Sequence, residues 1–380
     1  MIKIVVLGGG LVGGPMAFDL ASDGDKQVTV VDISEKTLTR FDSHHRIETR
    51  CADISNPETL ASIVRDCDFV LNAVPGHMGF KTLKRLIQAG KNVIDIAFFP
   101  ENLFDLDQLA KDNGVTVLSD IGVAPGMSNI LIGYAHHQLD RTTHAITYVG
   151  GLPKVREWPY EYKAVFSPID VIEEYTRPAR YIEHGKEVIK PALSDPELMD
   201  FEGVGTLEAF NSDGLRSLAH TIKADYMIEK TLRYPGHIDI MKILRYTGFF
   251  SKEKININGL ELAPLDLTSR LLFPKWKLKE GEEDITVMKI IVEGFKGKEN
   301  LRYTWDLLDT YDPSTGVHSM ARTTGYTATM ALRMVAEGLY TEKGVSAPEF
   351  VGKNPECVEF ILKGLKERNI HYIQKTEKIN

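Results

Sequence analysis

The stretch IKIVVLGGGLVGGPMAFDLASDGDKQVTVVDIS, residues 2–34, places a glycine-rich turn between two apolar runs. Its glycines Gly8, Gly10 and Gly13 match the pattern G-x-G-x-x-G, directly after a strand-like run and at the start of a helix-like one. The first glycine permits a tight turn, the second lets a pyrophosphate approach the backbone, and the third lets helix and strand pack closely. The stretch therefore predicts a strand–helix–strand unit that binds a dinucleotide at the helix N-terminus.

The second apolar run ends on Asp32, a position that bears on the choice of dinucleotide. A carboxylate there accepts hydrogen bonds from both ribose hydroxyls and repels a 2′-phosphate. The segment DISEK, residues 32–36, supplies only Lys36 as a nearby positive charge. We therefore expect NAD as the cofactor, with NADP as the alternative. A simple helix or turn cap is the other interpretation of Asp32.

Short apolar runs alternate with amphipathic segments over the first 125 residues. Each crossover between parallel strands needs a helix that packs on the sheet. The alternation therefore predicts an α/β fold with a Rossmann-type, doubly wound parallel sheet. Strands are expected at 2–7, 27–31, 47–50, 69–72, 92–96 and 116–118, and helices at 12–22, 57–64, 80–89 and 103–112.

Ligands of such sheets lie outside the carboxyl ends of the strands, and several candidate residues fall there. Asp53 follows the third strand, where an adenine ring would lie, and NAVPG, residues 72–76, follows the fourth. Asp95 and Phe98 stand at the end of the fifth strand, near the reacting ring, although a core role is equally open for Phe98. The expected cofactor-binding residues are Gly8, Gly10, Leu11, Val12, Gly13, Asp32, Asp53, Ala73, Val74 and Pro75.

The sequence pattern changes after GVAPGMSN, residues 122–129. Aromatic and β-branched residues alternate with polar ones in 144–152, 285–294 and 300–309, which is typical of a half-exposed antiparallel sheet. A long amphipathic helix is expected at 325–340, and a charged one follows it.

These patterns predict three parts of the chain. A dinucleotide-binding domain is expected over 1–125, and an α+β domain with a mixed or antiparallel sheet over 126–324. We expect the last part, residues 325–380, to form helices that pack back on the first domain.

Composition and charge exclude several classes of protein. The chain of 380 residues carries a net charge of −8 and no basic block, so neither nucleic acid nor a membrane is an expected partner. No apolar run is long enough to span a bilayer and no signal-like segment opens the chain, so we expect a cytoplasmic protein. The cysteines Cys51, Cys67 and Cys357 and the histidine pairs at 44–45 and 136–137 lack metal-site spacing, and no metal is expected.

Polar residues concentrate in four stretches of the second domain. Glycines and prolines in them predict ordered loops, where binding groups often lie, although a solvated face is the alternative for any one residue. The stretches are PYEYKAVFSP (159–168), EEYTRPARYIEHGK (173–186), GTLEAFNSDGLRSL (205–218) and KTLRYPGH (230–237).

The motifs GGGLVGG, NAVPG, GVAPGMSN, YKAVFSP and KTLRYPGH together resemble the saccharopine dehydrogenase family, from residue 1 to about residue 250 and less distinctly to about residue 350. Within this family, GVAPGMSN and PYEYKAVFSP are more similar to the lysine 6-dehydrogenase branch. The resemblance implies a Rossmann domain, an inserted α+β domain with dimer contacts, and a substrate cleft between them. It also implies a homodimer or higher homo-oligomer. Asp120 and Ala124 depart from the EIGLDPG pattern of saccharopine reductase-like members.

The resemblance further implies an oxidoreductase that acts on an amino-acid amine. The expected reaction is oxidative deamination of the lysine ε-amine to 2-aminoadipate 6-semialdehyde, which cyclises to piperideine-6-carboxylate. Because an ammonium has no lone pair, the amine must lose a proton before hydride leaves, and a proton acceptor must lie nearby. Placement in the sequence makes Asp95, Lys163 and His237 the candidates, although a structural ion pair is the alternative for Lys163.

An amino-acid α-carboxylate calls for a planar two-pronged donor. Arg233 is preferred over Arg177 and Arg180 for this role, with an intradomain salt bridge as the alternative. The expected substrate-binding residues are Gly76, Phe98, Tyr162, Arg177, Thr206, Asn211 and Arg233.

Three other functions remain open at this point. A saccharopine dehydrogenase or reductase would use the same fold on a substrate with three carboxylates, so its pocket should bring two or three arginines together. A relative that condenses an aldehyde with a diamine is a weaker alternative. A non-catalytic NAD-binding sensor belongs to a different class.

Overall fold

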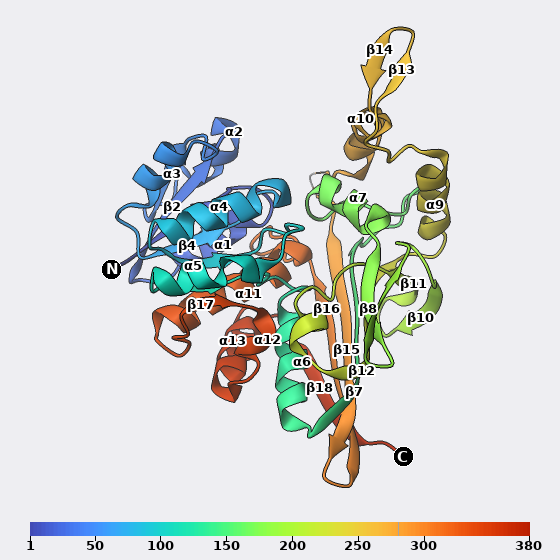
Figure 1. The fold of residues 1–380 in the computed structure, drawn as a ribbon. Coiled ribbons are helices and arrows are strands. Elements are labelled where there is room, and N and C mark those ends of the chain that lie inside the picture. Colours follow the sequence, from blue (N-terminus) through green and yellow to red (C-terminus); the bar gives the residue numbers. More distant parts are fainter. Residues whose placement is uncertain (280) are drawn as a thin grey trace. The chain divides into compact units, whose positions relative to one another are not determined.

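The computed structural model describes residues 1–279 and 281–380, which form two compact units (Figure 1). Unit 1 consists of Met1–Gln138 and Ala321–His371, and unit 2 consists of Leu139–Met320 and Tyr372–Asn380.

Unit 1 contains, within the described residues, a seven-stranded sheet in the order β17-β6-β5-β4-β1-β2-β3. Neighbouring strands pair in parallel throughout, so the expected Rossmann-type sheet is confirmed. The strands are β1 (Ile2–Leu7), β2 (Lys26–Asp32), β3 (Ile47–Cys51), β4 (Phe69–Asn72), β5 (Asn92–Asp95), β6 (Thr116–Leu118) and β17 (Gly344–Ser346).

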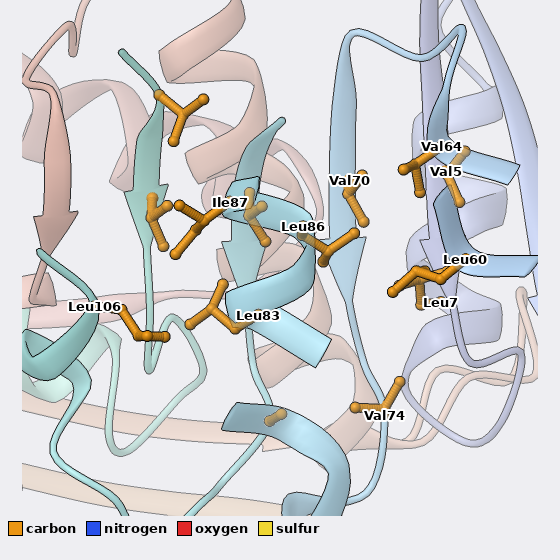
Figure 2. Close-up of a cluster of buried hydrophobic side chains, with 14 of the residues drawn as sticks. Val5, Leu7, Leu60, Val64, Val70, Val74, Leu83, Leu86, Ile87 and Leu106 are labelled. Carbon is orange, nitrogen blue, oxygen red and sulfur yellow. The ribbon is translucent and has the colours of Figure 1, made fainter. Parts of the chain in front are cut away.

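Strands β1, β4, β5 and β6 are largely apolar and buried, as expected where helices cover both faces of a parallel sheet, whereas the edge strand β3 is mostly exposed. Figure 2 shows part of this core, in which Val5 and Leu7 lie beside Val64 and Leu60 of one covering helix, and Val70 lies beside Leu86 of another. The helical segments of unit 1 are α1 (Gly13–Ala21), α2 (Glu35–Leu38), η1 (Thr39–Phe41), α3 (Pro57–Val64), α4 (Gly76–Gln88), η2 (Leu103–Leu106), α5 (Asp107–Asp112), α6 (Met127–Gln138), α11 (Ser319–Ala336), α12 (Pro348–Val351) and α13 (Pro355–Glu367), where α11 begins at the end of unit 2.

Buried ion pairs attach the C-terminal helices to α1 within unit 1. Arg333 of α11 contacts Asp19 at 2.7 Å and Asp23 at 2.8 Å, and Arg368 contacts the other oxygen of Asp19 at 2.6 Å. The side chains of Arg333 and Asp19 are almost fully buried, at 7% and 8% exposure. The C-terminal helices therefore share a unit with the dinucleotide-binding fold.

The structural division differs from the expected boundaries at residues 125 and 324. Helix α6 stays in unit 1 because it packs backbone to backbone on α12, where a Cβ added at Gly133 would lie 2.4 Å from the carbonyl oxygen of Glu349. The expectation of helices alone over 325–380 also missed two strands. The short β17 extends the sheet beside β6, and β18 (Tyr372–Lys378) belongs to unit 2, where it pairs with β16 (Glu299–Thr310).

Unit 2 is built on a mixed sheet, as expected. Its main path runs β10-β11-β12-β7-β15-β16-β18 in the described residues, with β8 and β9 attached to β12. Strand β12 (Ala224–Arg233) pairs in parallel with β7 (Arg141–Pro153), whereas β15 (Asp284–Lys296) pairs antiparallel with both β7 and β16. Strands β7, β15 and β16 contain the three alternating segments that predicted an antiparallel sheet.

The remaining elements of unit 2 surround this sheet. In Figure 1 the hairpin β13–β14 projects beyond α10. These elements are α7 (Pro168–Thr176), β8 (Ala179–Glu183), β9 (Lys186–Lys190), β10 (Glu197–Phe201), β11 (Gly205–Asn211), α8 (Leu218–Thr221), α9 (His237–Thr247), β13 (Ile255–Ile257), β14 (Leu260–Leu262) and α10 (Pro264–Trp276).

Two of the four stretches expected to be loops are strand over half of their length. Thr206 and Asn211 lie on β11, and Lys230 and Arg233 lie on β12. On β11 the polar Thr206 and Glu208 alternate with Leu207 and Ala209, which is the period of a strand.

Candidate functional site

The glycine turn after β1 has the geometry that its pattern predicts. Gly8 has a φ of +97°, and a Cβ there would lie 2.6 Å from the carbonyl oxygen of Ala73. A Cβ at Gly13 would lie 1.9 Å from the carbonyl oxygen of Gly8, so helix and strand pack as closely as expected. A Cβ at Gly10 meets no heavy atom within 4 Å. The open space beside Gly10 fits a pyrophosphate at the start of α1.

Asp32 at the end of β2 stabilises this turn through two hydrogen bonds. One carboxylate oxygen accepts a hydrogen bond from the Gly9 amide at 2.9 Å, and the other accepts from the Ser34 amide at 2.8 Å. Asp32 therefore acts as a turn cap, as one of its two interpretations predicted. The half-buried carboxylate keeps further lone pairs, and its contact with a ribose stays a prediction.

Arg40 is a cation near the turn that the sequence analysis missed. Its guanidinium carbon lies 5.6 Å from the ring centres of both Phe18 and Phe41, and a Cβ at Gly14 would lie 2.7 Å from one of its terminal nitrogens. Arg40 lies one helical turn beyond the segment DISEK, whose only cation is Lys36.

The other predicted cofactor residues lie at the carboxyl edge of the sheet, and their side chains differ in solvent exposure. Leu11 is exposed, whereas the side chain of Val74 is buried in the core and leaves only its backbone for a ligand. Gly76 begins α4, and Pro75 is the N-cap residue just before it. Asp53 is exposed, and the hydrogen bond that it accepts from Ser55 lowers the pKa of its carboxyl.

Of the two phenylalanines after β5, Phe99 is a core residue. It is fully buried and lies edge-on against Phe80 with ring centres 5.6 Å apart. Phe98 is half-buried, so the structure leaves both a wall role and a core role open for it.

Asp95 at the end of β5 is fully buried in unit 1. It accepts hydrogen bonds from the Asn72 side chain at 2.9 Å, the Ser119 hydroxyl at 2.8 Å and the Ala97 amide at 3.1 Å. Burial raises the pKa of its carboxyl to about 7, against the lowering effect of these three donors. Asp95 is thus divided between its charged and neutral forms near neutral pH.

Lys163 of unit 2 is buried and ion-paired. Its ammonium lies 3.1 Å from Glu157 and 3.4 Å from Glu282. The predicted alternative, a structural ion pair, therefore describes its contacts, whereas the neighbouring Glu161 pairs with Arg156.

Three of the predicted residues, His237, Arg233 and Tyr162, come together in one buried cluster of unit 2. The Arg233 guanidinium lies 4.5 Å from the ring centre of Tyr162 and donates to the Tyr175 hydroxyl at 3.0 Å and to Glu174 at 2.6 Å. The partners Glu174 and Tyr175, both on α7, were not anticipated because nothing in the sequence links α7 to β12.

His237 occupies both of its ring nitrogens in this cluster. Nε2 lies 2.9 Å from the Tyr175 hydroxyl, and Nδ1 lies 2.8 Å from the Tyr160 carbonyl oxygen. Because a carbonyl oxygen only accepts, Nδ1 carries the proton and Nε2 accepts from Tyr175. Burial lowers the pKa of this imidazole to about 3, so the ring is neutral at physiological pH. A proton transfer by His237 stays a prediction and would require one of these bonds to break.

The other predicted substrate residues of unit 2 have partners of their own. Arg177 lies 3.7 Å from Glu173, and the hydroxyl of Thr206 donates to Asp200 at 2.6 Å on an exposed part of β11. Asn211 is buried and donates to Ser194 at 3.0 Å and to Asp195 at 2.9 Å. Their contacts with a substrate remain predictions.

Residues 1–279 and 281–380 contain no group of three or more His, Cys, Asp or Glu side chains placed to hold a metal ion. Over the same ranges, none of the helices combines the length and the apolar character that crossing a bilayer requires.

Two family models together match most of the chain. The saccharopine dehydrogenase NADP binding domain matches residues 4–118, and the saccharopine dehydrogenase C-terminal domain matches residues 122–370.

Curated relatives agree with these matches. The chain is 23% identical to the saccharopine dehydrogenase [NADP(+), L-glutamate-forming] of Pyricularia oryzae, over 96% of this chain and 97% of the relative. It is 24% identical to the mitochondrial alpha-aminoadipic semialdehyde synthase of Mus musculus, over 91% of this chain but only 45% of that longer protein.

Solved structures show the same fold. The apo saccharopine dehydrogenase (L-Glu forming) of Saccharomyces cerevisiae superposes with a TM-score of 0.80 at 20% identity, covering 99% of this chain and 100% of that one. The homospermidine synthase of Legionella pneumophila in complex with NAD has a TM-score of 0.64 at 12% identity, covering 99% and 91%. From the domain matches and the NAD(P)-binding turn, the chain belongs to the saccharopine dehydrogenase family and is an oxidoreductase of the saccharopine dehydrogenase type.

Proposed function

We propose that this protein oxidises the ε-amine of lysine, giving 2-aminoadipate 6-semialdehyde, with NAD as the preferred cofactor. The bound nicotinamide supplies the hydride acceptor, and the protein supplies binding, orientation and proton transfer. Asp32 supports NAD because its carboxylate, braced by Gly9 and Ser34, would repel a 2′-phosphate.

The observation that favours lysine is the pairing of the candidate arginines in unit 2. Arg177 lies 3.7 Å from Glu173, Arg180 lies 2.8 Å from Asp213, and Arg233 lies 2.6 Å from Glu174. A substrate with three carboxylates needs several guanidinium groups that are available to it, whereas lysine needs one cationic partner. Carboxylates of the protein already neutralise these three arginines, and this supports the substrate with fewer negative charges.

The amine must be neutral when hydride leaves, and the protein has to take its proton. Asp95, Lys163 and His237 are the candidates that the sequence indicates. Their contacts differ, since Asp95 is fully buried, Lys163 bridges two glutamates, and His237 uses both ring nitrogens.

Saccharopine oxidation is the second candidate function. It is favoured by the similarity of the whole chain to the Pyricularia oryzae enzyme, whose name states NADP(+) as cofactor and L-glutamate as product. Arg40, which lies beside the glycine turn, is the cation that would bind the 2′-phosphate of NADP.

A substrate panel tests the proposal. Purified protein is incubated with NAD or NADP and with lysine, saccharopine, ornithine or a simple diamine, and reduced cofactor is followed by absorbance. We expect the highest kcat/KM with lysine and NAD. Turnover of saccharopine without lysine would refute the lysine proposal, and no turnover of any amine would favour a non-catalytic NAD sensor.

A matched pair of glycine variants excludes a contaminating dehydrogenase in this panel. Gly10→Ala adds a Cβ to the open space of the pyrophosphate site, whereas Gly24→Ala adds one where no heavy atom lies within 4 Å and no ligand is expected. Both variants should fold, and only Gly10→Ala should lose turnover.

A further inference from the structure

The carboxyl group of Asp95 joins the ends of three neighbouring strands of unit 1. Asn72, the last residue of β4, is the register partner of Asp95 at the end of β5, and its side chain donates to Oδ1 at 2.9 Å. Ser119 directly follows β6 and donates to Oδ2 at 2.8 Å, while the Ala97 amide donates to Oδ1 at 3.1 Å. We call Asn72, Asp95, Ala97 and Ser119 the Asp95 network.

Backbone bonds extend the Asp95 network into the segments that follow these strands. The Ile96 amide donates to the Asn72 carbonyl at 3.0 Å, and the Ile121 amide donates to the Asp95 carbonyl at 3.1 Å. Ala73, the next residue after Asn72, contacts the glycine turn, because a Cβ at Gly8 would lie 2.6 Å from its carbonyl oxygen. The network thus sets where three segments start at the edge that takes the cofactor.

The Asp95 network makes unit 1 less stable than apolar side chains at the same positions would make it. Asp95 and Asn72 are fully buried, and Asn72 Oδ1 has no hydrogen-bond donor among the described residues. An unsatisfied buried acceptor is destabilising, and replacing buried ionic groups by apolar side chains of similar volume is often neutral or stabilising. The residues just before them, Leu71 and Ile94, are apolar and fully buried. Polar groups retained at such a cost are expected at functional positions.

We propose that Asp95 is a positioning residue: it fixes the segments after β4, β5 and β6 for the nicotinamide half of the dinucleotide and does not exchange a proton with the substrate. The Asp95 side chain has no exposed surface, and both of its oxygens already accept bonds from its own unit. The proposal rests on the proposed function for the reaction, but cofactor affinity tests it without any substrate.

The Asp95→Asn variant separates positioning from proton transfer. An asparagine keeps one oxygen for Asn72 and Ala97, and its amide nitrogen can donate to the Ser119 hydroxyl, which accepts as well as donates. The network then survives without a titratable group. Asp95→Leu instead removes every acceptor and leaves the three donors without a partner.

The variants are compared by NAD affinity, from fluorescence titration, and by separate kcat and KM values, with thermal melting as a check on folding. We expect Asp95→Asn to stay within about threefold of the wild type in NAD Kd and kcat, because its hydrogen bonds persist. Asp95→Leu should weaken NAD by about tenfold or more, since three buried donors lose their partner. Asp112→Asn, on an exposed carboxylate of α5, is the matched control.

If Asp95→Leu does not fold, Ser119→Ala replaces it. This change removes one donor from the network and should weaken NAD by about fivefold, the equivalent of one hydrogen bond of about 1 kcal/mol.

Two results would overturn the proposal. One is an Asp95→Asn enzyme with unchanged NAD affinity and KM but a kcat lower by about 10²–10⁴-fold, the signature of a lost general base. The other is unchanged NAD affinity in folded Asp95→Leu or in Ser119→Ala. If the wild type oxidises none of the amines, the proposed function fails, whereas the NAD affinities still decide this proposal.

Discussion

At the scale of single residues, the choice between NAD and NADP depends on two side chains of opposite charge near one turn. Asp32 braces the glycine turn through Gly9 and Ser34, and the Arg40 guanidinium lies beside Gly14. Asp32 favours a free ribose, whereas Arg40 can attract a 2′-phosphate. The preference is therefore the difference between two local effects rather than a property of the fold.

Removing each side chain should shift this preference in opposite directions. We expect Asp32→Ala to weaken NAD by about 10- to 100-fold, the equivalent of hydrogen bonds to a charged group worth about 1.5–3 kcal/mol, and to weaken NADP less. Arg40→Ala should weaken NADP and spare NAD. Fluorescence titration with both reduced cofactors measures these affinities, and an equal loss of both in Asp32→Ala would contradict the role given to its carboxylate.

At the scale of elements, the attachment of α11 and α13 to α1 depends on buried charges. Arg333 reaches Asp19 and Asp23, and Arg368 reaches Asp19, across more than 300 residues of sequence. Such pairs add little net stability when complete, but removing one partner leaves buried charges uncompensated.

We therefore expect Arg333→Ala to lower the free energy of unfolding of unit 1 by about 3–5 kcal/mol, because Asp19 and Asp23 lose their buried partner. Urea denaturation followed by far-UV circular dichroism measures the loss. The control is Lys111→Ala, which breaks the half-exposed pair with Asp107 and should cost no more than about 1 kcal/mol. Equal losses in the two variants would show that the Arg333 pairs are not a structural anchor.

At the scale of the whole molecule, Asp95 in unit 1 and His237 in unit 2 should make the free energy of unfolding depend on pH in opposite directions. Burial raises the pKa of Asp95 in unit 1 to about 7, so between about pH 4 and about pH 7 the folded state binds more protons than the unfolded chain, and the contribution of Asp95 to stability is lost as pH rises through this range. Burial lowers the pKa of His237 in unit 2 to about 3. There the unfolded chain binds more protons, and stability is lost as pH falls below about 6.5.

Tryptophan fluorescence isolates the response of unit 2, because Trp158, Trp276 and Trp305 all lie in that unit. Between about pH 6.5 and about pH 5 we expect its free energy of unfolding to fall by about 2 kcal/mol. The His237→Phe variant should lose this dependence, and Asp95→Asn should keep it. A wild-type unit 2 with the same urea midpoint at both pH values would contradict the inferred burial of a neutral His237.

The sequence by itself determined the features that arise from neighbours in the chain. The glycine turn, the alternation of strands and helices, and the strand periodicity of β7, β15 and β16 follow from backbone sterics and side-chain period, which act over a few residues. For the same reason the family resemblance could be stated from short motifs.

Only the tertiary structure decided which polar groups meet. Arg233 on β12 finds Glu174 on α7, Asp95 links Asn72 to Ser119, and β17 joins a sheet that begins at residue 2. Each is a contact between segments distant in sequence, and its partners are selected by packing and by the need to pair buried charges and donors. No local pattern encodes that selection, so the cofactor half was predictable while the partners of the substrate residues were not.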